Sequence, residues 1–158
     1  MFFQRKPALT RPVTFFSSSH VANTSSELMI DLFSGRADGK HLVQRLFLNP
    51  SFAAKVIAVV EKNVGAYEAR FGHIRVARGA APTEGEHVVE PAVYCNHVES
   101  TFTESEFFLD CRTVLVMKGK TPETLARLMA VATPGAIPPL VAGIKAAITS
   151  AAAQRPFP

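Results

Sequence analysis

The segment Ser26-Glu27-Leu28-Met29-Ile30-Asp31-Leu32 has a near copy at Ser105-Glu106-Phe107-Phe108-Leu109-Asp110-Cys111. Serine, glutamate and aspartate coincide in the two segments, and the other positions match in apolar type. In the first segment every second residue from Leu28 onward is a large aliphatic side chain, which is the period of a strand with one buried face. The chain therefore carries one strand motif twice, and this predicts an internal duplication.

Other residues support the duplication. The same offset places three further residues on similar ones, namely Pro12 on Pro91, Phe15 on Tyr94 and Thr24 on Thr103. A third block aligns residues 49–57 with residues 121–129, at an offset that is seven residues smaller. This alignment assigns the longer hairpin loop to the first copy, around Ser34 to Lys40.

The first copy is predicted to fold as strands followed by a helix. Strands are expected over Val13–His20, Glu27–Phe33 and Leu42–Leu48, with an Asp-Gly turn before the last of them. Asn49 can cap a helix that begins at Pro50, because proline suits the first helical position. Apolar residues then recur at helical spacing until a C-terminal stop at Gly72.

The second copy is predicted to repeat this scheme. Strands are expected over Ala92–His97, Thr103–Arg112 and Thr113–Met117. A helix is expected to begin at Thr121-Pro122 and to stop at Thr133-Pro134-Gly135, because Thr can cap it and Pro can start it. A separate alanine-rich helix follows from Pro138-Pro139 to about residue 153.

These elements predict an α+β fold. Two β-β(-β)-α repeats form one antiparallel sheet with helices on one face, and a C-terminal helix is added. Sharing one sheet removes the open edge that a single repeat would leave. The expected organisation is a basic tail or short targeting segment at 1–11, repeat 1 at 12–73, a linker at 74–90, repeat 2 at 91–133 and a proline-broken helix and tail at 134–158.

The strand motif at Ser26–Leu32 and the helix ending at Tyr67–Gly72 together resemble a family of small prokaryotic proteins of unknown function. In that family a strand ends in S-x-E, two apolar residues, x, D and an apolar residue, and the closing helix ends Y-E-x-x-F-G. The resemblance covers about residues 12–73 well and residues 91–132 in part, where the helix ending is lost. It implies a fold without an activity, and it implies that one chain replaces a dimer of single-repeat units.

The N-terminus is basic and free of acidic residues before Glu27. It contains Arg5, Lys6, Arg11 and the run Ser17–Ser19. Mitochondrial presequences and short basic tails both have this composition, and the sequence leaves the two open. No unbroken apolar run follows the basic residues, so secretion is not expected. The expected location is the mitochondrial matrix side or a bacterial-type cytoplasm.

The cysteines and the apolar C-terminal segment indicate neither a CxxC site nor a membrane-spanning helix. Cys95 and Cys111 form no CxxC pair, and we expect two buried free thiols, with a disulfide as the alternative. The most apolar segment, Leu125–Ile148, contains Arg127, Lys145 and three prolines. A membrane-spanning helix needs about 20 apolar residues with few charges, so none is predicted.

Catalytic constellations are not evident. The paired carboxylates Glu27 and Asp31, and their copies Glu106 and Asp110, are expected to form the solvated side of a strand. The five histidines show no metal-site spacing, and glycines form no phosphate-binding loop. We therefore predict that the protein is not an enzyme, and we expect neither a metal nor a cofactor.

The charges are unevenly distributed along the chain of 158 residues, whose net charge is +4. Residues 83–111 contain seven acidic side chains and no Lys or Arg, whereas residues 112–158 contain one acidic and six basic side chains. Adjacent patches of opposite sign suit contacts with proteins. We expect a non-catalytic structural or adaptor subunit of a larger assembly, with other subunits or a second copy as partners. The expected docking residues are Val141, Ile144 and Ile148.

Single-stranded nucleic acid is the alternative partner. Aromatic side chains on an exposed sheet face can stack on bases, and the predicted strands carry several phenylalanines. Basic residues in the loops would meet phosphates, and the candidates are Arg75, Arg78, Lys118 and Lys120.

Overall fold

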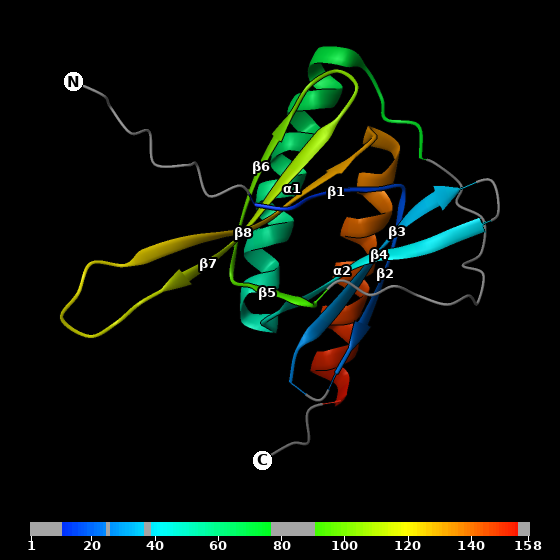
Figure 1. The fold of residues 1–158 in the computed structure, drawn as a ribbon. Coiled ribbons are helices and arrows are strands. Elements are labelled where there is room, and N and C mark those ends of the chain that lie inside the picture. The colour runs from blue at the N-terminus through cyan, green and yellow to red at the C-terminus, as the bar shows by residue number, and fades with distance from the viewer. Residues whose placement is uncertain (1–10, 25, 37–38, 77–90, 155–158) are drawn as a thin grey trace, which may run out of the picture.

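The structure of the protein is a computed structural model that describes residues 11–24, 26–36, 39–76 and 91–154. In these residues eight strands and two long helices form an α+β fold, which confirms the predicted class (Figure 1). The predicted N-terminal segment before residue 11 lies outside the described residues, as does the part of the predicted linker from 77 to 90.

The elements follow one order in each half of the chain. The first half contains β1 (Val13–Phe16), β2 (Ser18–Asn23), β3 (Leu28–Arg36), β4 (Gly39–Leu48) and α1 (Pro50–Phe71). The second half contains β5 (Val93–Cys95), β6 (His97–Phe102), β7 (Phe107–Leu115), β8 (Glu123–Ala132), a short 3-10 turn (Pro134–Ala136) and α2 (Ile137–Gln154).

The strands form two four-stranded sheets, not the single antiparallel sheet that the sequence led us to expect. The strand orders are β1-β8-β7-β6 and β2-β3-β4-β5. Three strands of each sheet are antiparallel, and the fourth strand, β1 or β5, joins in parallel. Each parallel strand comes from the other half of the chain, because β1 pairs with β8 and β5 pairs with β4. This exchange of strands interlocks the two halves.

Each exchanged strand turns a corner into the opposite sheet. The corner residue is Ser17 between β1 and β2, and Asn96 between β5 and β6. The backbone N–H of Ser17 donates to the carbonyl of Phe33 at 2.8 Å, and that of Asn96 donates to the carbonyl of Arg112 at 3.0 Å. A strand that bends between two packed sheets is a recognised way to close the corner of a sandwich.

The two halves are topologically equivalent. A shift of 79 residues moves both ends of β2 onto those of β6 and both ends of β3 onto those of β7. The pairing of β3 with β4 changes register between Leu32 and Phe33, and the pairing of β7 with β8 changes register between Cys111 and Arg112. These two irregularities fall at equivalent positions, so the equivalence extends to the local backbone.

The two parallel strand pairs, β1 with β8 and β5 with β4, are the junctions between the halves. They differ in which strand carries the larger side chain. Phe16 of β1 lies beside Ala132 of β8, and the small Cys95 of β5 lies beside Leu48 of β4. All four side chains are buried. Each junction therefore combines one large and one small residue, and the order of large and small is reversed between the junctions.

The predicted helix at Thr121-Pro122 is wrong, because the structure has strand β8 there. In β8 Leu128 and the run Ala130–Ala132 are buried, and β8 is hydrogen-bonded on both sides, to β7 and to β1. The counterpart of Asn49-Pro50 is Thr133-Pro134, which precedes the turn into α2. Pairing with β7 and β1 therefore outweighs the helix-start signal of Thr121-Pro122.

The longer hairpin belongs to the second half, which also corrects the sequence alignment. β3 and β4 are separated by two residues, 37 and 38, whereas β7 and β8 are separated by residues 116–122. The β7–β8 hairpin projects away from the body of the protein (Figure 1). We call residues 114–124 the arm.

Helix α1 begins and ends as its sequence predicts. The Asn49 side chain accepts a hydrogen bond from the Ser51 N–H at 2.9 Å, and Pro50 occupies the first turn. Gly72 ends the helix with a φ of 97°, a conformation that favours glycine, and its N–H donates to the carbonyl of Glu68 at 3.0 Å.

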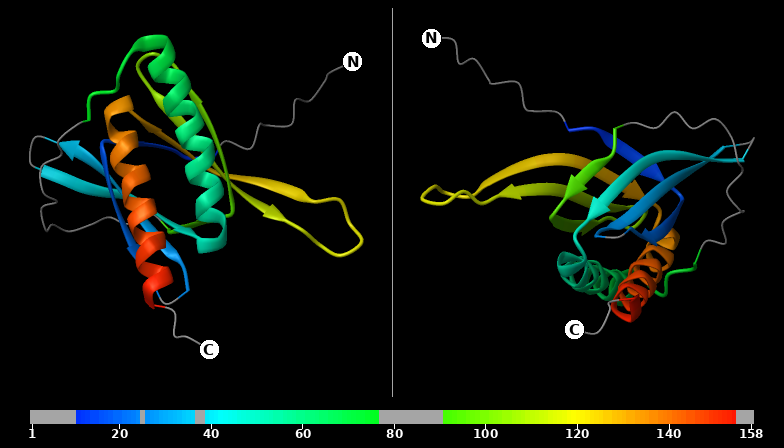
Figure 2. Two further views of the ribbon diagram at one scale, coloured as in Figure 1. Left: turned by 180° about the vertical axis from the view of Figure 1, so that it is seen from behind. Right: turned by 90° about the horizontal axis from the view of Figure 1, so that it is seen from below.

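Both helices lie on one side of the sheets and cross between the halves (Figure 2). Helix α1 packs on β6 of the second half, and α2 packs on β2 of the first half. The Asn23 side chain of β2 donates to the carbonyl of Ala147 at 2.8 Å, and the Tyr67 hydroxyl of α1 donates to the carbonyl of Glu104. An ion pair between Glu61 and Lys145 links α1 to α2.

The proposed docking stripe on α2 faces the core, which corrects that prediction. Val141 is 7% exposed and Ile144 is 2% exposed, and Ile148 packs against the same core. The apolar period of α2 therefore reflects packing on the sheets within the protein. Val141 and Ile144 are therefore not available to a partner in this fold, and Ile148 is partly buried.

Candidate binding surface on the outer face of the sheets

The sheets present a second face, directed away from the helices. In β3, the core residues Leu28, Ile30 and Leu32 alternate with Met29 and Asp31, so the latter two lie on this outer face. In the described part of the chain both helices lie on the opposite side (Figure 2). The outer face therefore carries no covering helix in the described part of the chain.

Apolar side chains form a row across the outer face of each sheet. The strand registers place neighbouring residues of three strands side by side in each row. One row contains Met29, Phe47 and Tyr94, and the other contains Phe108, Val131 and Phe15. Phe15 is 63% exposed and Tyr94 is 42% exposed, at equivalent positions on the two exchanged strands. We call these six residues the apolar rows.

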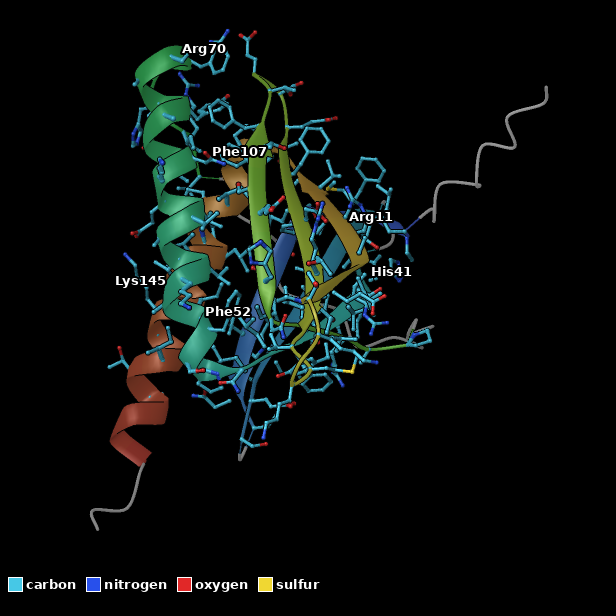
Figure 3. The ribbon with its side chains drawn as sticks, turned by 90° about the vertical axis from the view of Figure 1, so that its left-hand side faces the viewer. Arg11, His41, Phe52, Arg70, Phe107 and Lys145 are labelled. Carbon is cyan, nitrogen blue, oxygen red and sulfur yellow. The ribbon has the colours of Figure 1, made fainter. Side chains whose placement is uncertain are left out.

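Ion pairs lie beside the apolar rows. The Arg45 guanidinium donates to both carboxylate oxygens of Asp31, at 2.7 and 3.1 Å, and this hydrogen bonding raises the pKa of Arg45. Asp110 pairs with Arg112 at 2.7 Å and with Arg11 at 3.0 Å. Arg11 lies on the side of the sheets away from the helices (Figure 3).

These carboxylates differ from the solvated acids that the sequence led us to expect. Asp31 and Asp110 are each only 8% exposed, because long neighbouring side chains cover them. Glu27 and Glu106, the other members of the predicted pairs, are partly exposed. These hydrogen bonds hold the arginine side chains against the sheet, and the carboxylates of Asp31 and Asp110 accept them.

The composition of the outer face is typical of the centre of a protein interface. Such centres are enriched in aromatic residues, methionine and arginine and depleted in lysine. The apolar rows contain three phenylalanines, a tyrosine, a methionine and a valine, and arginines flank them. Within the rows Phe15 and Tyr94 are exposed, Met29, Phe47 and Phe108 are partly exposed, and Val131 is 2% exposed. Apolar side chains in place of the usual polar ones make this face the candidate binding surface.

The candidate phosphate-binding residues do not form one site. Arg75 is exposed beyond the end of α1, whereas Lys118 and Lys120 are exposed at the tip of the arm, on a different part of the protein (Figure 1). Arg78 lies outside the described residues. Among the phenylalanines of the predicted strands, Phe16 and Phe107 are buried in the core, and only Phe15 is strongly exposed.

The cysteines are two buried free thiols. A hydrogen bond with Cys95 and burial both raise the pKa of the Cys111 thiol well above its usual range. A thiol that stays protonated is a poor nucleophile. A cavity of about 30 Å³ between the sheets and helices is lined by apolar residues and both thiols, and it offers no polar partner to a bound molecule.

The described residues contain no group of three or more His, Cys, Asp or Glu side chains that could hold a metal ion. His97 contacts Glu99 at 3.3 Å and the ring of Phe52 at 6.3 Å between centroids. His87 lies outside the described residues. Among the described helices, none is long and apolar enough to span a membrane.

The described residues form an α+β domain of two interlocked halves whose outer sheet face carries the apolar rows beside Arg–Asp ion pairs. Residues 13–76 match the model of a family described as a protein of unknown function (DUF3467). The match covers β1 through α1, which is one of the two equivalent halves and less than half of the chain. It agrees with the similarity to an uncharacterised family over about residues 12–73. No curated protein matches the chain, and no solved structure does.

Proposed function

We propose that the protein is a non-catalytic structural or adaptor subunit of a larger protein assembly, and that the apolar rows are its docking surface. The observation that carries this proposal is the pair of apolar rows, each crossing three strands and each ending in an exposed aromatic residue. Arginines that are already paired with aspartates suit the burial of this face against a protein, because buried charges are tolerated when they are paired.

Removing the two exposed aromatic residues should release the partner. We expect the double variant Phe15→Ser, Tyr94→Ser to lose most of the protein that co-purifies with the wild-type chain, because aromatic anchors dominate interface energies. The measurement is native affinity purification with quantitative mass spectrometry. The matched control is Val59→Ser, because Val59 is an apolar residue of α1 that is 37% exposed. Equal recovery of partners with both variants would refute the docking surface.

A single-stranded nucleic-acid-binding module is the second candidate. The observations that favour it are the exposed rings of Phe15 and Tyr94 and the exposed lysines at the tip of the arm. Stacking platforms of this kind bind with strong salt dependence. Titration of labelled single-stranded oligonucleotides at low salt tests it, and a salt-sensitive complex that the double variant fails to form would favour this candidate over the adaptor.

We also propose that the chain arose as a tandem duplication of one β-β-β-β-α unit. The equivalent strand ends, the equivalent register changes and the match of one half to a family model support it. In this proposal the single chain takes the place of a dimer, and the exchanged strands β1 and β5 are the former contacts between two subunits.

A further inference from the structure

The tip of the arm exposes both apolar and basic side chains. Val116 is 77% exposed and Met117 is 48% exposed. The Lys120 N–H donates to the Met117 carbonyl at 3.1 Å and closes a turn, in which Gly119 has a φ of 78°. The turn holds Lys118 and Lys120 at the extreme end of the hairpin. Val116 and Met117 therefore lie outside the core.

A second turn, at the other end of β7, carries acidic side chains. The Thr103 N–H donates to the Glu106 carbonyl at 2.8 Å and closes this turn, on which Glu104 is exposed. Glu106 borders a groove of about 210 Å³ whose wall includes Phe15 and Val131. The groove therefore combines one carboxylate and three hydroxyl residues, Ser17, Ser34 and Thr133, with an apolar wall, and the arm combines ammonium groups with apolar side chains.

The charges of the two turns have no partners within the described structure. Ion pairs recorded among the described residues include neither Glu104 and Glu106 nor Lys118 and Lys120. The turns lie at opposite ends of β7, a nine-residue strand that spans roughly 30 Å. They cannot meet in one molecule, whereas they can meet between two molecules arranged head to tail.

We propose that the arm of one copy of the chain docks in the groove beside the acidic turn of a second copy. Val116 and Met117 contact the apolar wall, and Lys118 and Lys120 pair with Glu104 and Glu106. Phe15 and Val131 also belong to the apolar rows, so the arm and the partner of the proposed function would compete for this end of the outer face. The charge-reversed variants below leave the rows unchanged, so failure of this contact is distinguishable from failure of the proposed function. A contact between two different surfaces repeats from copy to copy, so the assembly is a ring or an open chain.

A lipid bilayer fits the arm less well than a protein groove does. Lys118 lies at the centre of the turn and Lys120 closes it opposite Met117, so insertion deep enough to bury Val116 and Met117 would carry both charges into the hydrocarbon, where they are strongly disfavoured. An acidic groove with an apolar wall accommodates both kinds of side chain, and the chain itself provides such a groove.

Analytical ultracentrifugation of the purified full-length protein tests the contact. At low salt we expect the average mass to rise above that of the monomer as the concentration is raised, and to fall when salt is added, because exposed charge pairs are screened. The variants Lys118→Glu, Lys120→Glu and Glu104→Lys, Glu106→Lys should each weaken self-association about tenfold or more. Val116→Ser should weaken it without changing the salt dependence.

Mixing the two charge-reversed variants provides the decisive control. Each variant has an arm and an acidic-turn region of like charge, so neither associates with itself. In the mixture each arm meets a turn of opposite charge, and association should return. A wild-type chain that stays monomeric at all concentrations would overturn the proposal, as would a mixture that stays monomeric. Binding of an oligonucleotide through the lysines by a chain that does not self-associate would overturn it in favour of a nucleic acid.

Discussion

Phe107→Ala lowers the free energy of unfolding by about 3–5 kcal/mol, which is the usual cost of removing a fully buried phenylalanine. Phe107 is 0% exposed and begins β7 in the second half of the chain. Its ring lies 5.4 Å from that of Tyr67 and 5.5 Å from that of Phe102, measured between centroids. Tyr67 belongs to α1 of the first half. The space left by removing the Phe107 ring would therefore lie between the two halves (Figure 3).

The matched control is Phe108→Ala, one residue further along the same strand. Phe108 is partly exposed on the outer face, so its truncation should cost about 1 kcal/mol or less. Denaturant unfolding followed by hydrogen exchange measures both variants. We expect the β3 and β7 segments to lose protection together in Phe107→Ala, because α1 spans both halves. Equal costs for the two variants, or separate unfolding of β3 and β7, would contradict the interlocked packing.

The isolated first half, residues 11–76, should fail to fold as a stable monomer. Its β1 loses β8, its β4 loses β5, and its α1 loses the surface of β6. The inner face of β3 would then be exposed to water at a cost that a small domain with a total stability of about 5–15 kcal/mol cannot offset. Separation of the halves is therefore the largest disruption that the structure predicts.

The two halves should fold together when they are mixed. A pair of first halves would set Phe16 against Leu48 at both junctions, which overfills the core, whereas the natural junctions combine large with small side chains. We expect circular dichroism and light scattering to show a folded 1:1 complex of residues 11–76 with residues 91–158. A folded monomer of residues 11–76 alone, with a cooperative unfolding transition, would contradict this account.

Much of the fold is encoded in local patterns. The alternation at Leu28–Leu32 and its copy at Phe107–Cys111 correctly predicts two strands, because each buries one face. Helix α1 is delimited by Asn49 and Gly72, whose capping chemistry depends only on neighbouring backbone. These features were predictable because the residues that decide them lie within a few positions of each other.

The features that local patterns predicted wrongly are those that depend on residues far apart in the sequence. The segment 123–132 has a helix-start signal before it, yet pairing with β7 and β1 makes it a strand. The exchange of β1 and β5 depends on chain segments far apart in the sequence, and a single sheet was the simpler expectation. The helical spacing of Val141 and Ile144 fits a docking stripe and a core face equally well, and only the position of α2 on β2 shows that these residues are core.

The candidate binding surface could not be predicted from the sequence, for a similar reason. Phe15 and Tyr94 were recognised as equivalent residues, but the rows that they complete need the register of three strands. Met29 and Phe47 stand at alternate positions where a solvated strand would carry polar residues, and this was the one available signal. The sequence alone did not indicate which sheet face the helices leave uncovered.

Site-specific photo-crosslinking tests the proposed function most directly. A photoreactive phenylalanine analogue replaces Tyr94 in the full-length chain expressed in its native cells, and the same analogue at Val59 of α1 provides the control. We expect the analogue at position 94 to crosslink to a defined protein that the analogue at position 59 does not reach. Crosslinks from position 94 to nucleic acid alone, or the same set of proteins from both positions, would contradict the assignment of the outer face as a protein-docking surface.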